Sequence, residues 1–302
     1  MESTEKRQKN VSKTLRVLNK KEHLPQGLIR LFTKILALQL EAHTHVSVDF
    51  SGFDFPSLCR SVGQGGSCLS PQNFPLDNKN GVALFFRIVA LITDPAEEIP
   101  EPIVRAAGEV ARGIETKTLD LEQAFRESLS GEGPIHTAWA QRTPEAPGIL
   151  RFLMLASLEP SLHAVEQILG DHLHGDGKVS VIRQTGTCPI CGNLPYILEL
   201  RGKEGVRFAL CSLCRHEYRI RRLACPVCDS NDFDKIAYFT VEEEPGFRVE
   251  TCESCNTYMK TIDFRGLDRQ ACPEFNDLES MALDYLAAKQ GLKRSTLSVW
   301  GI

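Results

Sequence analysis

Four closely spaced pairs of cysteines stand out in the second half of the chain. Each pair has the form Cys-x-x-Cys, in which two thiolates can bind the same metal ion. Four thiolates in a tetrahedral arrangement suit Zn²⁺ or a single iron ion, as in rubredoxin. The pattern therefore predicts two four-thiolate metal sites. Their eight ligands are Cys188, Cys191, Cys211, Cys214, Cys225, Cys228, Cys252 and Cys255.

The spacing of the pairs indicates an internal repeat, which decides which cysteines share a metal. The gap inside the first copy is 19 residues and the gap inside the second is 23, whereas only 10 residues separate the copies. Each gap contains two strand-like segments around a turn, and a β-hairpin brings its two ends together. We therefore predict one site from the first four cysteines and another from the last four.

We call each Cys-x-x-Cys turn a knuckle. The residue that follows a knuckle tests the metal-site prediction without relying on the cysteines themselves. In a knuckle, backbone N–H groups point at the first thiolate, and the residue after the second cysteine often needs a positive φ. Gly192, Asp229 and Asn256 are of types that adopt or tolerate this conformation, while Arg215 is the exception. Three of the four knuckles are thus followed by a residue type that suits a positive φ.

Other interpretations of the cysteine pairs remain open at this point. A thioredoxin-like dithiol should open a helix after a strand, and four pairs in a strand-rich setting do not fit that pattern. From spacing alone, the simplest interpretation is that both sites staple a small domain. Spacing does not choose between inert zinc and redox-active iron. Cys59, Cys68 and Cys272 lie outside the repeat, and we expect them to be buried or incidental.

The first 175 or so residues have the apolar periodicity of helices. Leu28, Leu31 and Phe32 recur at steps of three and four residues, although Gln39 interrupts this stripe. Pro160 separates the last two helices expected in this part of the chain, at 149–158 and 162–169, because proline starts a helix more readily than it continues one. The further helices are expected at residues 82–92, 102–113, 118–129, 149–158 and 162–169.

Strand-like alternation begins after Gly175-Asp-Gly177 and gives way to a helix near the end of the chain. Asn276 can cap this helix with Glu279 as its capping-box partner, and Gly291 fits the C-terminal stop. We therefore predict an α+β protein with a helical N-terminal domain. Its expected parts are a helical domain at 1–175, a first rubredoxin-like or zinc-ribbon four-cysteine module at 176–223, a second at 224–270, and a C-terminal helix and tail at 271–302.

Composition and charge narrow the function classes. The 302 residues are 42% hydrophobic and 25% charged, which is typical of a globular protein of about two domains. A net charge of −4 and a pI near 6.1 argue against bulk electrostatic binding of DNA or RNA. The basic segment at 215–222 is either a third strand with solvated arginines or a surface for nucleic acid or an acidic partner. The strand is the simpler interpretation.

We expect neither a signal peptide nor a membrane span. Residues 1–22 are polar, and the longest apolar stretch, at 82–92, is far shorter than the roughly 18 residues of a spanning helix. These features predict a cytoplasmic protein, in which thiols stay reduced and serve metals rather than disulfides. The sequence also has no Walker loop, Rossmann fingerprint, G-x-S-x-G or HExxH motif. We therefore predict no enzyme activity, no catalytic residues and no organic cofactor.

The order of these motifs resembles the family of the formate dehydrogenase accessory protein FdhE over about residues 185–295. The tail at 277–291 continues the match, which extends more loosely over the helical half. The segments that carry the resemblance are Cys188-Pro-Ile-Cys191-Gly-Asn-Leu-Pro195, Arg207-Phe-Ala-Leu-Cys211-Ser-Leu-Cys214, Cys225-Pro-Val-Cys228 and Glu250-Thr-Cys252-Glu-Ser-Cys255-Asn-Thr-Tyr258-Met-Lys260.

The resemblance implies a cytoplasmic, chaperone-like maturation factor with a helical domain and two rubredoxin-like modules. Such factors serve respiratory formate dehydrogenases, molybdenum enzymes that are exported after cofactor loading, and act on the catalytic subunit. Only the eight cysteines carry over as functional residues. The resemblance favours two mononuclear iron ions, with zinc as the alternative metal. The competing functions are a rubredoxin-like one-electron carrier and a zinc ribbon that binds nucleic acid; we expect no nucleic acid. The oligomeric state is not indicated.

Overall fold

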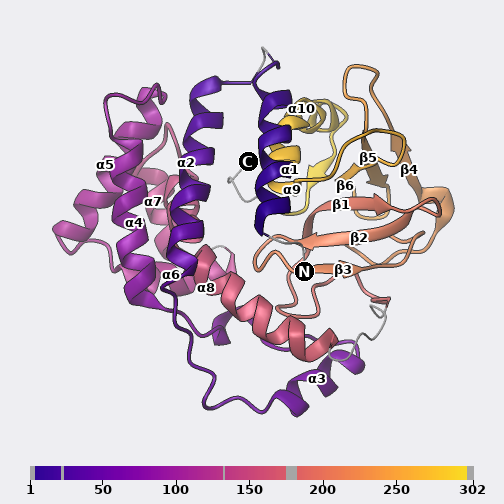
Figure 1. Ribbon diagram of the computed structural model, residues 1–302, viewed down its shortest axis with the longest axis horizontal. Helices are drawn as coiled ribbons and strands as arrows, with labels where there is room; N and C mark the ends of the chain where they lie inside the picture. Colours follow the sequence, from indigo (N-terminus) through magenta and orange to yellow (C-terminus); the bar gives the residue numbers. More distant parts are fainter. Residues whose placement is uncertain (1–3, 22–23, 132, 175–181, 298–302) are drawn as a thin grey trace. The chain divides into compact units, whose positions relative to one another are not determined.

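The computed structural model describes residues 4–21, 24–131, 133–174 and 182–297, and these form two compact units (Figure 1). One unit, called here the sheet unit, takes its described residues from Met1–Glu22, Phe55–Cys68 and Gly170–Ser298. The other, the helical unit, takes them from His23–Asp54 and Leu69–Leu169. Each unit therefore combines segments that are separated in the sequence. The predicted domain boundary at 175 lies within 175–181, outside the described residues, and the domain boundaries stay predictions.

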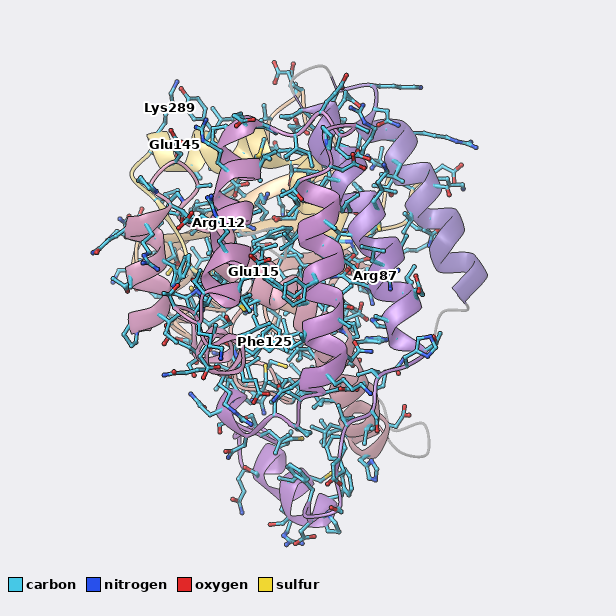
Figure 2. The ribbon with its side chains drawn as sticks, turned by 90° about the vertical axis from the view of Figure 1, so that its left-hand side faces the viewer. Arg87, Arg112, Glu115, Phe125, Glu145 and Lys289 are labelled. Carbon is cyan, nitrogen blue, oxygen red and sulfur yellow. The ribbon has the colours of Figure 1, made fainter. Side chains whose placement is uncertain are left out.

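The helical unit buries the apolar faces of its helices against one another. Phe85, Ile88 and Phe125 are fully buried, and Figure 2 labels Phe125 together with surface residues such as Arg87. Arg87 lies on the exposed face of α4 and forms an ion pair with Glu41. The elements of this unit are α2 (Gln26–His43), the 3₁₀ turn η1 (Pro71–Asn73), α4 (Asn78–Ile92), α5 (Glu101–Glu115), α6 (Leu121–Ser130), α7 (Pro134–Arg142) and α8 (Ile149–His174) as far as residue 169.

Helix α8 corrects the sequence prediction of two helices separated at Pro160. The helix continues through Pro160. Proline has no N–H, so the carbonyl of Ala156, four residues earlier, lacks its usual helical donor. The buried side chain of Gln39 on α2 supplies one, since its Nε2 donates to the Ala156 oxygen at 2.8 Å. The polar residue that interrupted the apolar stripe of α2 is therefore the partner that lets α8 continue.

The sheet unit contains a seven-stranded sheet in the order β3-β2-β1-β6-β5-β4, with β7 paired to β6. Strands β1–β3 and β4–β6 are two antiparallel meanders, one for each copy of the repeat. Parallel pairing of β1 with β6 joins them. The strands are β1 (Pro195–Arg201), β2 (Val206–Cys211), β3 (Glu217–Arg219), β4 (Ile236–Phe239), β5 (Phe247–Cys252), β6 (Thr257–Ile262) and β7 (Lys293–Arg294).

The helical elements of the sheet unit come from widely separated parts of the sequence. Helix α1 contacts α9, although the two lie at opposite ends of the chain. The predicted α+β class, with a helical N-terminal region and two β modules that each carry four cysteines, is confirmed. The helical elements of this unit are α1 (Thr4–Leu18), α3 (Phe55–Gly63), the 3₁₀ turn η3 (Phe233–Lys235), α9 (Pro273–Glu279) and α10 (Met281–Lys289).

The capping prediction for the last helix is wrong in detail. Helix α9 begins at Pro273, a residue type favoured in the first helical turn, so Asn276 lies inside the helix. Its Oδ1 instead accepts from the N–H of Cys272 at 2.6 Å, and its Nδ2 donates to Glu279. A break at Ser280 then separates α9 from α10, so the predicted single helix is two.

A buried network of charges holds these C-terminal elements to β6. The Nζ atom of Lys260, 1% exposed, lies 2.8 Å from Asp277 Oδ1 and 2.7 Å from Asp284 Oδ2. Arg294 on β7 also pairs with both aspartates, and the Tyr258 hydroxyl donates to Asp284. Burial raises the pKa of Asp277, but the two cations lower it further, so that its pKa lies below the usual value. The network therefore fixes α9 and α10 beside the second module.

Candidate metal centres

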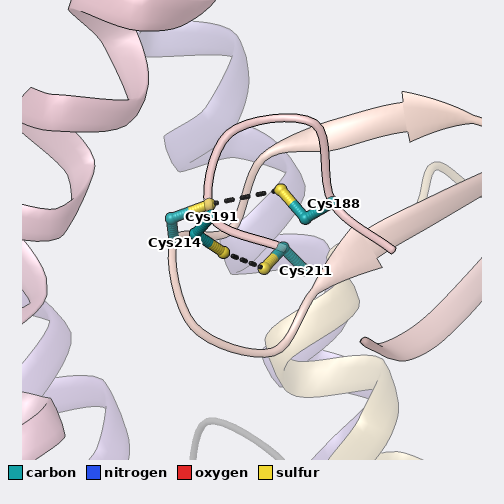
Figure 3. Close-up of side chains that lie close together, drawn as sticks. All are labelled: Cys188, Cys191, Cys211 and Cys214. Atoms are coloured by element: carbon teal, nitrogen blue, oxygen red, sulfur yellow. Dashed lines mark hydrogen bonds between the residues drawn. The ribbon is translucent and has the colours of Figure 1, made fainter. Parts of the chain in front are cut away.

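The structure brings the eight cysteines together as two groups of four. Within each group the ligand atoms all lie within 4.8 Å of one another. The first group comes from β1–β2 and its flanking knuckles, and the second from β4–β5 and its knuckles. They are the two sets of cysteines that the predicted hairpins brought together, and Figure 3 shows the first set. The groups are Cys188, Cys191, Cys211 and Cys214, and Cys225, Cys228, Cys252 and Cys255.

The pairing register of the strands explains why the four cysteines of each group come together. Pro195 at the start of β1 pairs with Cys211 at the end of β2, and Ile236 pairs with Cys252 in the same way. The end of each hairpin therefore places its second knuckle beside its first. Ala224, the residue before Cys225, is also held by the preceding module, because Arg207 Nη1 donates to its carbonyl at 2.7 Å.

The knuckles have the backbone geometry that thiolate ligands need. The N–H groups of Ile190, Leu213 and Val227 each point at the first sulfur of their own knuckle at 3.4 Å. All four residues that follow a knuckle have positive φ, namely Gly192, Arg215, Asp229 and Asn256, at 75°, 64°, 58° and 54°. Arg215, the exception by residue type, thus adopts the same conformation. Its guanidinium lies 5.5 Å from the ring centre of Tyr196, within the range of a stabilising cation–π contact. The positive φ of Arg215 is itself unfavourable for a residue with a Cβ atom.

The sulfur–sulfur distances fit a tetrahedral metal ion. A Zn–S bond of about 2.3 Å gives tetrahedron edges of about 3.8 Å. The two contacts drawn in Figure 3 measure 3.6 Å between Cys188 and Cys214 and 3.3 Å between Cys191 and Cys211. In the second group the distances are 3.7 Å between Cys225 and Cys255 and 3.8 Å between Cys228 and Cys252. Both groups can therefore hold one ion each with small adjustments.

The electrostatics of the first group also favour a cation. Burial raises the pKa of Cys188 and Cys214 well above that of an ordinary thiol, because a thiolate there loses its hydration. Burial acts on Cys191 too, but hydrogen bonds from the neighbouring thiols lower its pKa well below the ordinary value. The protein alone thus stabilises charge on one of these three sulfurs. A divalent ion would stabilise thiolates at the other positions, since it is the largest local charge in such a site.

The three cysteines outside the repeat do not join either group. Cys68 is buried beside the first knuckle, where its N–H donates to the carbonyl of Pro189 at 2.8 Å. Burial raises the pKa of its thiol to about 12, so it remains protonated near neutral pH. Cys272 is the N-cap residue of α9, and Cys59 is partly exposed on α3.

Sequence reasoning missed the residues that hold the two modules together. Arg207 is buried on β2 and forms an ion pair with Glu250 on β5. The period of two in a strand places Arg207 on the same face as Ala209 and Cys211, which could have marked it as inward-facing. The buried Arg183, which instead holds the end of α3 and the loop after it, gives no such signal, because its carbonyl partners at Val62 and Gly65 are distant in sequence.

Comparisons with known proteins agree with this geometry. Residues 187–222 match the family model described as FdhE, central domain, and residues 223–300 match that described as FdhE, C-terminal domain. The resemblance to the FdhE family is confirmed. The FdhE central-domain match contains the first group of cysteines, and the FdhE C-terminal-domain match contains the second.

Individual FdhE proteins show the same relationship. An FdhE homologue of Aquifex aeolicus is 31% identical over 147 residues, covering 47% of this chain and 49% of its own length. One from Pseudomonas aeruginosa is 36% identical over 156 residues, covering 47% and 50%. The chain thus spans about half the length of these relatives. The crystal structure of the FdhE protein from Pseudomonas aeruginosa superimposes with a TM-score of 0.66 at 22% identity, covering 97% of this chain and 94% of that one, which shows a shared fold.

Within the part of the chain that the structure describes, none of the helices has the length and apolar character needed to cross a bilayer.

Proposed function

We propose that this protein is a non-enzymatic accessory factor for the assembly of formate dehydrogenase. It binds the catalytic subunit of that enzyme in the cytoplasm and carries two mononuclear four-thiolate metal ions. The observation that carries the proposal is the pair of four-cysteine groups, each placed inside a match to an FdhE domain. The cysteines of each group would be the ligands, and their close sulfur–sulfur distances support that role.

The donor sets favour an accessory role over catalysis. Catalytic metal sites keep one coordination position open for water or substrate, whereas four protein thiolates close a tetrahedral site. Among the described residues, these two are the only groups of three or more His, Cys, Asp or Glu that can hold a metal. When bound, iron would supply one-electron chemistry and zinc would supply structural support alone. The preference for iron rests on the family resemblance, since the geometry suits both ions.

A one-electron redox protein is the second candidate, and the exposure of Cys228 favours it. An electron reaches a metal more readily through a ligand that solvent or a partner protein can approach. Reversible bleaching of ferric thiolate absorption in the isolated protein would support this function, whereas a colourless zinc protein would exclude it.

Binding of nucleic acid receives no support from the basic segment at 215–222. Strand β3 occupies its centre, as the simpler interpretation predicted. Arg221 donates to the carbonyl of Asp229 at 3.0 Å, and the Arg215 side chain lies over Tyr196. Two of its arginines therefore make contacts within the protein, which leaves a small basic surface on an acidic chain.

Anaerobic co-purification tests the proposed partner. We expect the tagged, metal-loaded protein to retain the catalytic subunit of formate dehydrogenase from the same organism when both are produced together. A Cys59→Ser variant should retain it equally well, because Cys59 belongs to neither group. A Cys211→Ala variant should retain at least about tenfold less, since metal binding and folding of its module are coupled. If fully metal-loaded protein captures no catalytic subunit, the accessory function is wrong.

A further inference from the structure

The two four-cysteine groups differ in their access to solvent. In the first group the four cysteines are 0% or 1% exposed. In the second, Cys225 and Cys252 are buried at 3%, but Cys228 is exposed and Cys255 is partly exposed. The internal repeat therefore gives the two groups the same ligands in unequal environments.

A segment that comes from far earlier in the chain covers part of the first group. The loop after α3 covers its first knuckle, where the Cys68 N–H donates to Pro189 and Ser67 Oγ lies 3.2 Å from the place of a Cβ on Gly192. The buried Arg183 ties this loop down, because its guanidinium donates to the carbonyl oxygens of Val62 and Gly65. A ligand that approaches the first knuckle from this side would have to displace the loop.

The contacts around the second group hold its backbone but leave a sulfur open. Asn256 Nδ2 donates to the carbonyl of Gly291 at 3.0 Å, and Asp229 accepts from the N–H of Gly186 at 2.7 Å. The hydroxyls of Ser230 and Ser254, beside the two knuckles, lie 3.5 Å apart in an exposed position. Cys228 is therefore a fixed ligand with an accessible sulfur.

We propose that the second group is an exchangeable metal site, opened at Cys228, whereas the first group is a locked structural site. This inference rests on the proposal that both groups bind metals. A soft external ligand, such as a small thiol or a pyridyl chelator, would form a bond to the ion as the bond to the Cys228 sulfur breaks. The released thiolate then takes a proton from water, and no electrons are transferred. Accessible thiolates exchange faster than buried ones for the same reason that they react faster.

Chelator competition on the full-length protein tests the inference. The protein is loaded with two equivalents of Zn²⁺ and mixed with 4-(2-pyridylazo)resorcinol, which reports released zinc by its colour. We expect one equivalent to be released at least about tenfold faster than the other, because only one group presents an accessible sulfur. The Cys228→Ser variant should lose the fast equivalent and keep the slow one, whereas Cys59→Ser should keep both phases.

Alkylation of the unmutated, zinc-loaded protein gives a second measurement that does not depend on the folding of a variant. Among the eight ligands, iodoacetamide should modify Cys228 first and the first group last, as read by mass spectrometry of peptides. Release of both equivalents at one rate, or equal alkylation of the two groups, would overturn the inference. Protein that binds no zinc at all would instead refute the metal sites, while a failed co-purification would leave the exchange result intact.

Discussion

Replacement of Cys211 by alanine is expected to remove one metal ion per chain and to unfold the first β module. Cys211 is fully buried at the end of β2, and its sulfur lies 3.3 Å from that of Cys191. Three thiolates leave the fourth position to water, which is a weaker ligand, so we expect the ion and its contribution to folding to be lost together. We expect the free energy of unfolding to fall by about 5 kcal/mol or more, because structural zinc contributes on the order of 10 kcal/mol in small metal domains.

Metal analysis and circular dichroism of Cys211→Ala check this expectation. The matched control is Cys59→Ala, which removes a thiol from the same compact unit but from outside both groups. The control should keep two ions and a spectrum like that of the parent protein. If Cys211→Ala also keeps two ions and an unchanged spectrum, then Cys211 is not a ligand.

The Gln39→Leu substitution is expected to destabilise the helical unit by about 2 kcal/mol, because it leaves the buried Ala156 carbonyl without a donor. Leucine fills a similar volume, so loss of the hydrogen bond is the main change. Pro160→Ala provides the matched background, since alanine at 160 restores a backbone N–H to the same carbonyl. In that background Gln39→Leu should cost at least about 1 kcal/mol less.

Denaturant unfolding of the four proteins in this cycle, followed by the helical signal in circular dichroism, measures the coupling between the two residues. An equal loss of stability from Gln39→Leu in both backgrounds would show that the amide does not compensate for the proline.

The grouping of the eight cysteines into two sets of four could be predicted from the sequence because the constraints on it are local. The spacing within Cys-x-x-Cys, the hairpin between knuckles and the residue type after each knuckle all lie within about 30 residues of one another. Gly192 and Asn256 adopt the positive φ that their residue types suggest. Local signals of this kind also predicted the β-hairpin in each copy of the repeat and the α+β class.

The differences at Pro160 and in the packing of the sheet unit involve partners that are distant in sequence, whereas those at Asn276 and Arg215 are local. Pro160 correctly signals a lost hydrogen bond, but the side chain that replaces it comes from α2, more than 100 residues away. No periodic pattern in the sequence indicates that β1 pairs with β6 or that α1 contacts α9. Arg215 takes a conformation that its residue type disfavours, because the knuckle around it imposes the turn.

The unequal exposure of the two groups bears on how an accessory factor could use two similar sites. On our proposal, a locked first site would keep β1–β3 folded, while an open second site, reached at the exposed Cys228, would exchange its ion or respond to a partner. Duplication of one module, followed by covering of only one copy, would separate a structural role from a reactive one.

The most direct test of the metal sites is elemental analysis, with an ultraviolet–visible spectrum, of the full chain purified without oxygen. We predict two metal ions per chain, with iron giving sulfur-to-ferric charge-transfer bands after oxidation. Two zinc ions per colourless chain would support both metal sites but would show that the metal is not iron. Fewer than one metal ion per chain, with all eight thiols of the folded protein open to alkylation, would contradict the proposal that these cysteines are ligands.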